Sequence, residues 1–212
     1  MTFRQLLAPV LLASLLGGSG VFTSLSVGAV SEEASTPAAI HEQLRPLANL
    51  LARGEGNYNS VNRGWAGDTP QGIKGLTGSS FAGFSVNRVL EMQSGWLYAV
   101  GRYQFIPSTL RFAVNSSSVT WSDNFTPEVQ DRLMAALILY KRPIVISYLQ
   151  GNHDNVGAAV DALAREWACV EYRSGRGYYD GYGGNRASIS RHEVVRMLQN
   201  IKDSWQPGGE LP

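Results

Sequence analysis

A single acidic residue, Glu55, stands between Gly54 and Gly56 in the stretch LLARGEGNYNSVNRG at residues 50–64. An apolar run with helical spacing precedes it and turn-forming residues follow it, so we expect its carboxyl group where a helix gives way to a loop. By default such a side chain is a solvated carboxylate beside a helix C-cap. It is also a place from which one acid can reach a substrate.

The other residue types with catalytic potential lack partners at a suitable spacing. His41, His153 and His192 form no pair at metal-ligand spacing, and the sequence contains no HExxH or GxSxG motif, so we expect no metal and no cofactor. Cys169 is the only cysteine, which excludes an intramolecular disulfide. It follows a predicted helix that ends in Trp167, where a buried inert thiol is favoured over a reactive one.

Carboxylates therefore remain as the candidate reactive groups. Four of them lie in irregular stretches without an obvious structural duty, namely Glu55, Asp68, Glu171 and Asp180. Such an inventory suits glycosidic bond cleavage, in which a carboxylic acid protonates the leaving oxygen. General acid catalysis of this kind needs a Glu whose pKa is raised towards about 6 by apolar surroundings. Leu51, Tyr58 and Trp65 could supply those surroundings for Glu55.

The elements that must position these residues are mostly helices. Apolar residues recur at helical spacing, and Pro, Ser or Thr stands at several expected starts, which predicts helices over residues 37–53, 86–95, 107–113, 127–140, 156–167 and 191–201. We expect Pro46 to kink or divide the first helix. Residues 143–150 are ambiguous because the run IVI is β-branched, but we favour a short helix. Ser190 and Glu193 form a predicted capping box.

Two stretches between these helices are expected to be loops. Residues 57–84 are crowded with turn-forming residues, and we expect a long ordered loop or one small hairpin there. Residues 171–185 form a Gly- and Tyr-rich loop. The predicted fold class is mostly α (α+β), a helical domain with at most a small β-hairpin. Nucleotide-binding folds are disfavoured because strands and helices do not alternate and no Gly-rich phosphate loop occurs.

The N-terminal region has the pattern of an export signal. Arg4 is followed by an apolar run, and small residues lead up to Ala29, so we expect a signal peptide at residues 1–29 and an exported, periplasmic or secreted protein. An uncleaved anchor that tethers the protein to the inner membrane through residues 5–30 is the alternative. We expect a linker at 30–37, one catalytic domain at 38–205 and a tail at 206–212. The formal charge of +1 gives no basic field for nucleic acid, and we expect a monomer.

Three motifs in order resemble one enzyme family. The segment GEGNYNSVNRG, the segment AVGRYQFIPSTL at 99–110, and VDALAREWACV with SGRGYYDGYGGNRASIS at 160–190 are similar to the lambda-type phage endolysins and their bacterial relatives, glycoside hydrolase family 104. GRYQFIPST also resembles a segment of soluble lytic transglycosylases in the wider lysozyme-like superfamily. The resemblance spans roughly residues 38–203. It implies a lysozyme-like helical fold with a cleft that binds peptidoglycan glycan strands.

The resemblance also implies roles for particular residues. Glu55 matches the single catalytic acid, and Tyr103 and Gln104 match residues that line the cleft. Trp167, with one of Tyr178, Tyr179 or Tyr182, matches the far wall; Tyr178 and Tyr182 are our candidates, with Tyr58 and Ser60 as further substrate contacts. A structural role competes at several of these positions, because Tyr103 and Trp167 are expected to be partly core residues and Gln104 could only tie down its loop. We expect Arg102 to support that loop.

The family chemistry predicts a lytic transglycosylase, which cleaves the β-1,4 bond between N-acetylmuramic acid and N-acetylglucosamine. The C6 hydroxyl of the muramic acid attacks its own C1, so that Glu55 suffices as acid and base. One alternative is a hydrolytic muramidase that uses Glu55 and Asp68, although Asp68 in AGDTP is typical of a turn residue. Another is a wall-binding module without catalytic activity.

Overall fold

The first described helix, α2 (Arg45–Glu55), ends at Glu55. The computed structural model describes residues 40–63, 80–95 and 97–205, so the predicted helix start at Thr36 and Pro37 lies outside it. Pro46 occupies the first turn of α2, where its missing N–H is harmless because first-turn amides have no partner within the helix. A turn at residues 41–44 precedes α2, so the predicted helix does not run unbroken through Pro46. The buried face of α2 consists of Leu47, Ala48, Leu50 and Leu51.

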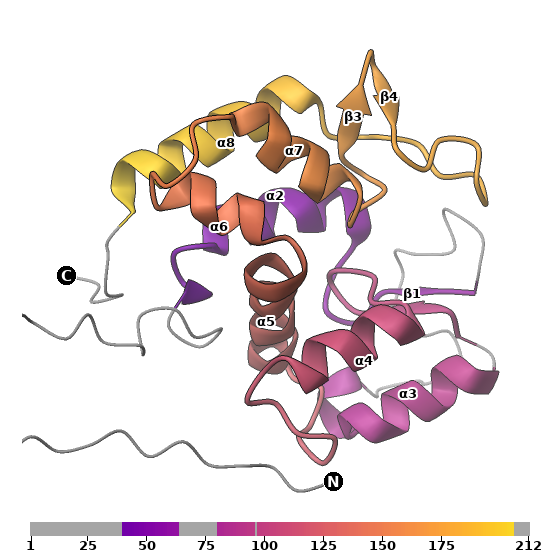
Figure 1. Cartoon of the computed structure of the whole chain (residues 1–212). Coiled ribbons are helices and arrows are strands. Elements are labelled where there is room, and N and C mark those ends of the chain that lie inside the picture. Colours follow the sequence, from indigo (N-terminus) through magenta and orange to yellow (C-terminus); the bar gives the residue numbers. More distant parts are fainter. Residues whose placement is uncertain (1–39, 64–79, 96, 206–212) are drawn as a thin grey trace, which may run out of the picture.

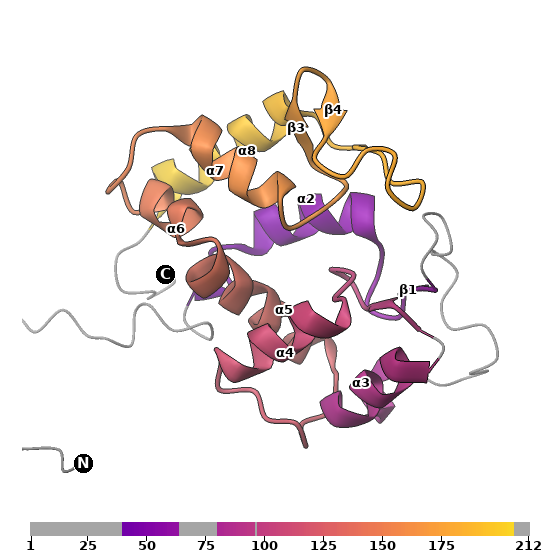
Figure 2. The ribbon, with the colours of Figure 1, turned by 45° about the vertical axis from the view of Figure 1, so that its right-hand side comes forward.

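The remaining elements confirm a mostly helical fold with small antiparallel sheets. In chain order they are β1 (Val61–Asn62), the 3-10 helix η2 (Phe81–Gly83), α3 (Val86–Gly95), β2 (Ala99–Val100), α4 (Pro107–Asn115), α5 (Pro127–Ala136), the π-helix η3 (Leu137–Lys141), α6 (Pro143–Leu149), α7 (Val156–Ala164), β3 (Glu171–Arg173), β4 (Arg176–Gly177) and α8 (Arg191–Ser204). Helices α6, α7 and α8 pack on one another, and α2 packs on α8. Figures 1 and 2 show α3 and α4 at the other end of the molecule, with α2 and α5 between the two groups.

Helix starts follow the predicted capping residues. The hydroxyl oxygens of Ser85, Thr126 and Ser190 each accept a hydrogen bond from the backbone N–H three residues later, at 3.2, 3.3 and 3.2 Å. These bonds satisfy amides that have no partner within the helix. The capping box at Ser190 is only half formed, because the Glu193 side chain turns away and pairs with Arg53 on α2 at 2.7 Å. Helix α8 is thereby attached to the end of α2.

Two helices end earlier than their sequence period predicts. The apolar period through Tyr140 predicted one long helix, but a π-helical turn follows α5, and its wider turn rotates the later side chains around the axis. Leu137 and Ile138 stay buried, whereas Tyr140 is 49% exposed. Helix α7 ends before Trp167, which lies in the following turn. The preferred interpretation of residues 143–150 as a short helix is confirmed by α6.

The two sheets arise where the sequence predicted loops. Strand β1 lies within the loop expected at 57–84, but it pairs with the distant β2, Val61 opposite Val100 and Asn62 opposite Ala99. The loop expected at 171–185 begins with the hairpin of β3 and β4. Sequence reasoning expected at most one hairpin and missed the β1–β2 pair, because neither strand is long enough to show an alternating pattern.

One hydrophobic core joins the described elements. Its buried cluster extends from Ile40 to Ile201, which fits one domain over the described part of the predicted range 38–205. The predicted signal peptide, linker and tail lie outside the described residues, as does the anchor at 5–30. No helix among the described residues combines the length and the apolar content that crossing a bilayer needs.

Candidate active site

A cavity of about 310 Å³ lies at the end of α2. Its described lining comes from six places in the chain. These are the end of α2, β1, the segment from β2 to the start of α4, the junction of η3 with α6, the segment after α7, and the loop at 179–185. The lining residues are Glu55, Asn62, Tyr98, Ala99, Tyr103, Gln104, Ile106, Ser108, Thr109, Lys141, Arg142, Arg165, Glu166, Trp167, Ala168, Tyr179, Gly183 and Asn185. The structure therefore brings together Glu55, Tyr103, Gln104 and Trp167, as the resemblance implied.

The carboxyl group of Glu55 is held in a largely desolvated place. Burial raises its pKa above the ordinary value of 4.5, and the hydrogen bond that the backbone N–H of Cys169 donates to Oε1 at 3.1 Å opposes this only in part. Among the described residues, no ion pair involves Glu55. A carboxyl group without a cation in a desolvated site favours its protonated form, which is what a general acid needs.

Cys169 contacts Glu55 but is not a second reactive group. Its side chain is buried, and burial together with the negative charge of Glu55 raises the pKa of the thiol well above 9.0. The thiol stays protonated at neutral pH and is therefore a poor nucleophile. The prediction that Cys169 is buried is confirmed, and its raised pKa agrees with the expected low reactivity.

The two glycines around Glu55 allow close approach of other segments. A Cβ on Gly54 would lie 2.4 Å from Cβ of Cys169 and 2.8 Å from Oγ of Ser188. Gly56 has φ of +146°, and a Cβ there would lie 2.4 Å from Oγ of Ser60. The motif is thus more than a helix end, because a side chain at Gly54 would push away the segment whose amide binds Glu55.

Gln104 carries two signs of a strained functional position. Its φ is +48°, in the left-handed region that residues other than glycine rarely adopt. Its side-chain Nε2 donates to the carbonyl oxygen of Gly101 at 2.9 Å, but the buried Oε1 has no partner among the described residues. An orphan acceptor of this kind costs about 1–3 kcal/mol. Gln104 lines the cavity, but this oxygen is shielded from solvent, so the side chain must turn before Oε1 can accept a hydrogen bond from a bound ligand.

Tyr103 and Trp167 are mostly core residues that show one edge to the cavity. Each is 2% exposed. The Tyr103 hydroxyl donates to Oδ1 of Asp131 on α5 at 2.5 Å, so its polar end is already occupied by the protein. Their expected core character is confirmed, and they shape the cavity more than they offer it polar groups.

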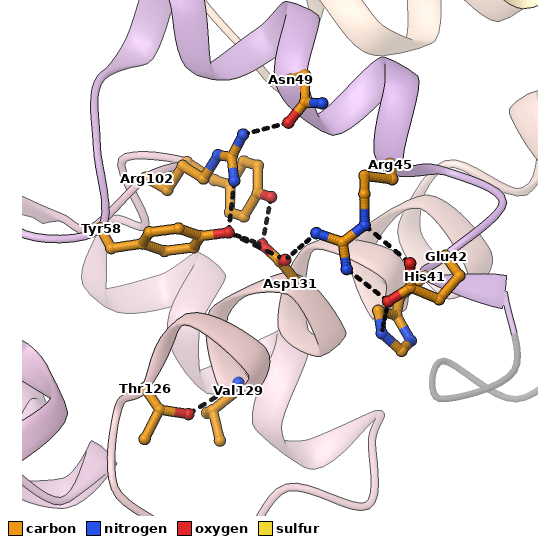
Figure 3. A network of polar contacts seen from close by, with 10 residues as sticks. His41, Glu42, Arg45, Asn49, Tyr58, Arg102, Thr126, Val129 and Asp131 are labelled. Carbon is orange, nitrogen blue, oxygen red and sulfur yellow. Dashed lines mark hydrogen bonds and ion pairs between the residues drawn. The ribbon is translucent and has the colours of Figure 1, made fainter.

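A polar network behind the cavity accounts for Tyr58 and Arg102 (Figure 3). The Tyr58 hydroxyl lies 3.1 Å from both oxygens of Asp131, and Arg102 donates to the same hydroxyl and, at 2.5 Å, to Asn49 on α2. Asp131 thus ties the segment after Glu55 to the loop that carries Gln104. Arg102 supports that loop, as predicted.

Tyr58 and Ser60 are not among the residues that line the cavity. Tyr58 points into the Asp131 network, and Ser60 is fully buried, where its hydroxyl accepts the N–H of Asn57 at 2.8 Å. Both positions hold the loop after Glu55 in place. The sequence motif marked this loop but could not separate side chains that face a ligand from those that fix the turn.

Tyr178 and Tyr182 line a second, more open depression of about 740 Å³. It shares Tyr98, Tyr179, Gly183 and Asn185 with the cavity, so the two are adjacent. Tyr182 is 73% exposed and Tyr178 is 46% exposed. Of the three tyrosines between which the sequence left the choice open, Tyr179 alone lines both hollows.

Sequence reasoning missed a group of charged residues on the cavity wall. Glu166 lies in the turn after α7, its side chain is 3% exposed, and its two oxygens pair with Lys141 and Arg142 at 2.8 Å each. Arg165 stands beside it on the same wall. The sequence offers no local signal for this group, because charged residues such as Lys141 and Arg142 near a helix end are usually solvated.

The other candidate carboxylates have structural partners where they are described. Glu171 accepts the N–H groups of Gly175 and Arg191, each at 3.0 Å. Asp180 accepts the N–H of Ala187 at 3.2 Å. Asp68 and Trp65 lie outside the described residues. Within the described ranges, no three His, Cys, Asp or Glu side chains are grouped so that they could hold a metal ion.

Comparison of the chain with protein-family models, with characterised proteins and with solved structures finds no match in any of the three. The case for a function therefore depends on the geometry of the cavity and on the motifs in the sequence.

Proposed function

We propose that this protein is a peptidoglycan lytic transglycosylase in which Glu55 is the single general acid and base. The observation that carries the proposal is the place of Glu55, a carboxyl group without a cation, with a raised pKa, on the wall of a cavity. Glu166 is the other carboxylate of the described lining, and both of its oxygens already pair with cations. One carboxyl group is therefore left for chemistry in the described cavity.

The proposed reaction needs one proton and no second carboxylate. Glu55 donates its proton to the bridging oxygen as the bond from this oxygen to C1 of the muramic acid breaks. The C6 hydroxyl of the same sugar then forms a bond to C1 and returns its proton to Glu55. The products are a 1,6-anhydro sugar and a free hydroxyl on the neighbouring sugar, and no water is consumed. After a turn of its side chain, Gln104 would offer Oε1, which has no partner among the described residues, as an acceptor for a hydroxyl or amide N–H of the sugar.

The test is the Glu55→Gln variant on isolated sacculi. Gln keeps the shape and the acceptor for the Cys169 N–H but cannot donate a proton as an acid. General acid catalysis contributes about 10² to 10⁴-fold, so we expect muropeptide release to fall by this factor. The matched control is Glu91→Gln on α3, an exposed Glu paired with Arg88 at 2.9 Å outside the cavity lining, which should keep full activity.

Mass spectrometry of the released muropeptides separates the possible activities. Anhydro-muropeptides support transglycosylation, whereas reducing ends support a hydrolytic muramidase and would direct attention to Asp68. Retained activity of Glu55→Gln would remove Glu55 from the reaction. Binding to sacculi without any release by the wild type would support a wall-binding module.

A further inference from the structure

The cavity wall carries more positive than negative side chains. Three cations and one carboxylate line the stretch of the cavity that we call the basic wall (Lys141, Arg142, Arg165 and Glu166). Lys141 binds Oε1 of Glu166 and Arg142 binds Oε2, so this carboxylate is fully engaged by two of the three cations. The third cation, Arg165, is left over.

Arg165 is held in place without being neutralised. Its guanidinium lies 5.2 Å from the ring centre of Tyr172 and 5.7 Å from that of Tyr178, and its Nη2 donates to the Tyr172 hydroxyl at 2.8 Å. Among the residues that the structure describes, no carboxylate forms an ion pair with Arg165. A guanidinium has five N–H donors, so several remain for a ligand.

The backbone around Arg165 fixes the direction of this wall. Its carbonyl oxygen accepts hydrogen bonds from Nη2 of Arg142 at 2.9 Å and from the Tyr179 hydroxyl at 2.8 Å. The same short segment continues to Cys169, whose N–H binds the carboxyl group of Glu55. A ligand group bound at Arg165 would therefore be held at a fixed position relative to the proposed catalytic acid.

We propose that the basic wall, with Arg165 as its main contact, binds a carboxylate of the peptide stem that peptidoglycan carries on its muramic acid. This inference rests on the proposed function and adds the part of the substrate that is recognised. A guanidinium matches the two oxygens of a carboxylate and binds them more strongly than it binds neutral hydroxyls. The glycan backbone of neutral sugars alone would leave the excess charge of this wall without a partner.

The test compares two substrates that differ only in stem charge. Soluble glycan–peptide fragments are used either in native form or after carbodiimide coupling with ammonia, which converts their carboxylates into amides and leaves the sugars unchanged. We expect the wild type to show a KM about tenfold higher on the amidated fragments with kcat nearly unchanged, the effect of losing one hydrogen-bonded ionic contact. A purely structural role of Arg165 would not make KM depend on amidation.

Variants of Arg165 locate the effect. Arg165→Gln should raise KM about tenfold on native fragments. Its KM should not rise further on amidated fragments, because amidation removes a contact that the variant has already lost. Arg165→Lys keeps the positive charge but lacks the paired N–H donors of a guanidinium, so its KM on native fragments should lie between those of the wild type and Arg165→Gln. Arg176→Gln, an exposed arginine on β4 outside the cavity lining, removes the same charge and should behave like the wild type. Thermal unfolding of each variant shows whether it is folded.

The outcomes separate this inference from the function on which it rests. Binding of both fragment types to the Glu55→Gln variant is measured by calorimetry in parallel. The carboxylate subsite is overturned, and the enzyme proposal is kept, if the wild type has equal KM for native and amidated fragments. The same holds if Arg165→Gln raises KM on native fragments but amidation does not raise the KM of the wild type. Charge-dependent binding without any cleavage by the wild type overturns the transglycosylase and keeps the subsite.

Discussion

Two carboxyl groups of this molecule, those of the partly buried Glu55 and the buried Asp161, have opposite surroundings. Asp161 on α7 is 8% exposed, and Arg191 donates to its Oδ1 at 2.6 Å while Arg173 donates to its Oδ2. Burial alone would raise the pKa of Asp161, but the hydrogen bonds and charges of the two arginines outweigh burial and lower it below 3.8. Glu55 has one backbone amide and no cation, and burial raises its pKa above 4.5.

The difference shows how position decides the role of one chemical group. Asp161 joins three elements, because Arg173 comes from β3 and Arg191 from the first turn of α8. Its charge is fixed, and it can hold these elements together but cannot exchange a proton near neutral pH. Glu55 has only the contact with the backbone N–H of Cys169, and its raised pKa suits the proposed acid. Under the proposed function, stability and chemistry are assigned to different carboxyl groups of one domain.

The largest effect that tests this contrast is expected from removing Asp161. Asp161→Ala leaves Arg191 partly buried without its carboxylate. Breaking a buried ion pair typically costs about 3–5 kcal/mol, and we expect a loss of roughly 3 kcal/mol because the other partner, Arg173, is exposed and screened. Urea unfolding measures this loss in the free energy of unfolding. The matched control is Asp154→Ala, whose fully exposed carboxylate lies 3.8 Å from Lys202 and whose removal should leave stability nearly unchanged. Equal losses in both variants would refute the structural role of Asp161.

The sequence predicted the structural elements better than the environments of their side chains. Capping residues and prolines marked the starts of α3, α4, α5 and α8, because these signals act within a few residues. The pairing of β1 with β2 and the engagement of Glu171 and Asp180 by backbone amides depend on segments far apart in the chain or on loop geometry. No local pattern encodes such contacts.

The candidate site shows the same division. Glu55 stood out because its flanking glycines and its place at a helix end are local features. The motif around Gln104 marked a loop, yet only the fold shows that Tyr58 and Ser60 in the neighbouring loop serve the Asp131 network and the turn. Glu166 and its cations were passed over, because a charged residue near a helix end is usually solvated and nothing local indicates a cavity.

A second test gives Glu55 the kind of neighbour that Asp161 has. Ala168 lines the cavity one residue before Cys169, so Ala168→Lys would bring an ammonium group towards Glu55. A cation close to a carboxyl group lowers its pKa, typically by about 1–3 units, and deprotonates the proposed acid. We expect activity at pH 7 to fall about tenfold and the pH of maximal activity to move down. Ala168→Gln, of similar length but uncharged, controls for steric hindrance, and an equal loss in that variant would exclude the electrostatic explanation.

The smallest effect should appear in the pH dependence of stability. Because the folded pKa of Glu55 lies above its unfolded value of 4.5, its favourable contribution is complete below that value and is lost as pH rises through the folded pKa. Glu55→Gln cannot ionise, so its stability relative to the wild type should increase over this window and then stay constant.

For Asp161 the sign is reversed, and its contribution, present above pH 3.8, is lost as pH falls through its lowered folded pKa. Urea unfolding between about pH 3 and 8 for the wild type, Glu55→Gln and Asp161→Asn measures both differences, in which shared titrations cancel. A flat difference between the wild type and Glu55→Gln would mean that the cavity solvates Glu55 as well as water does, and the proposed acid would then be ionised at neutral pH.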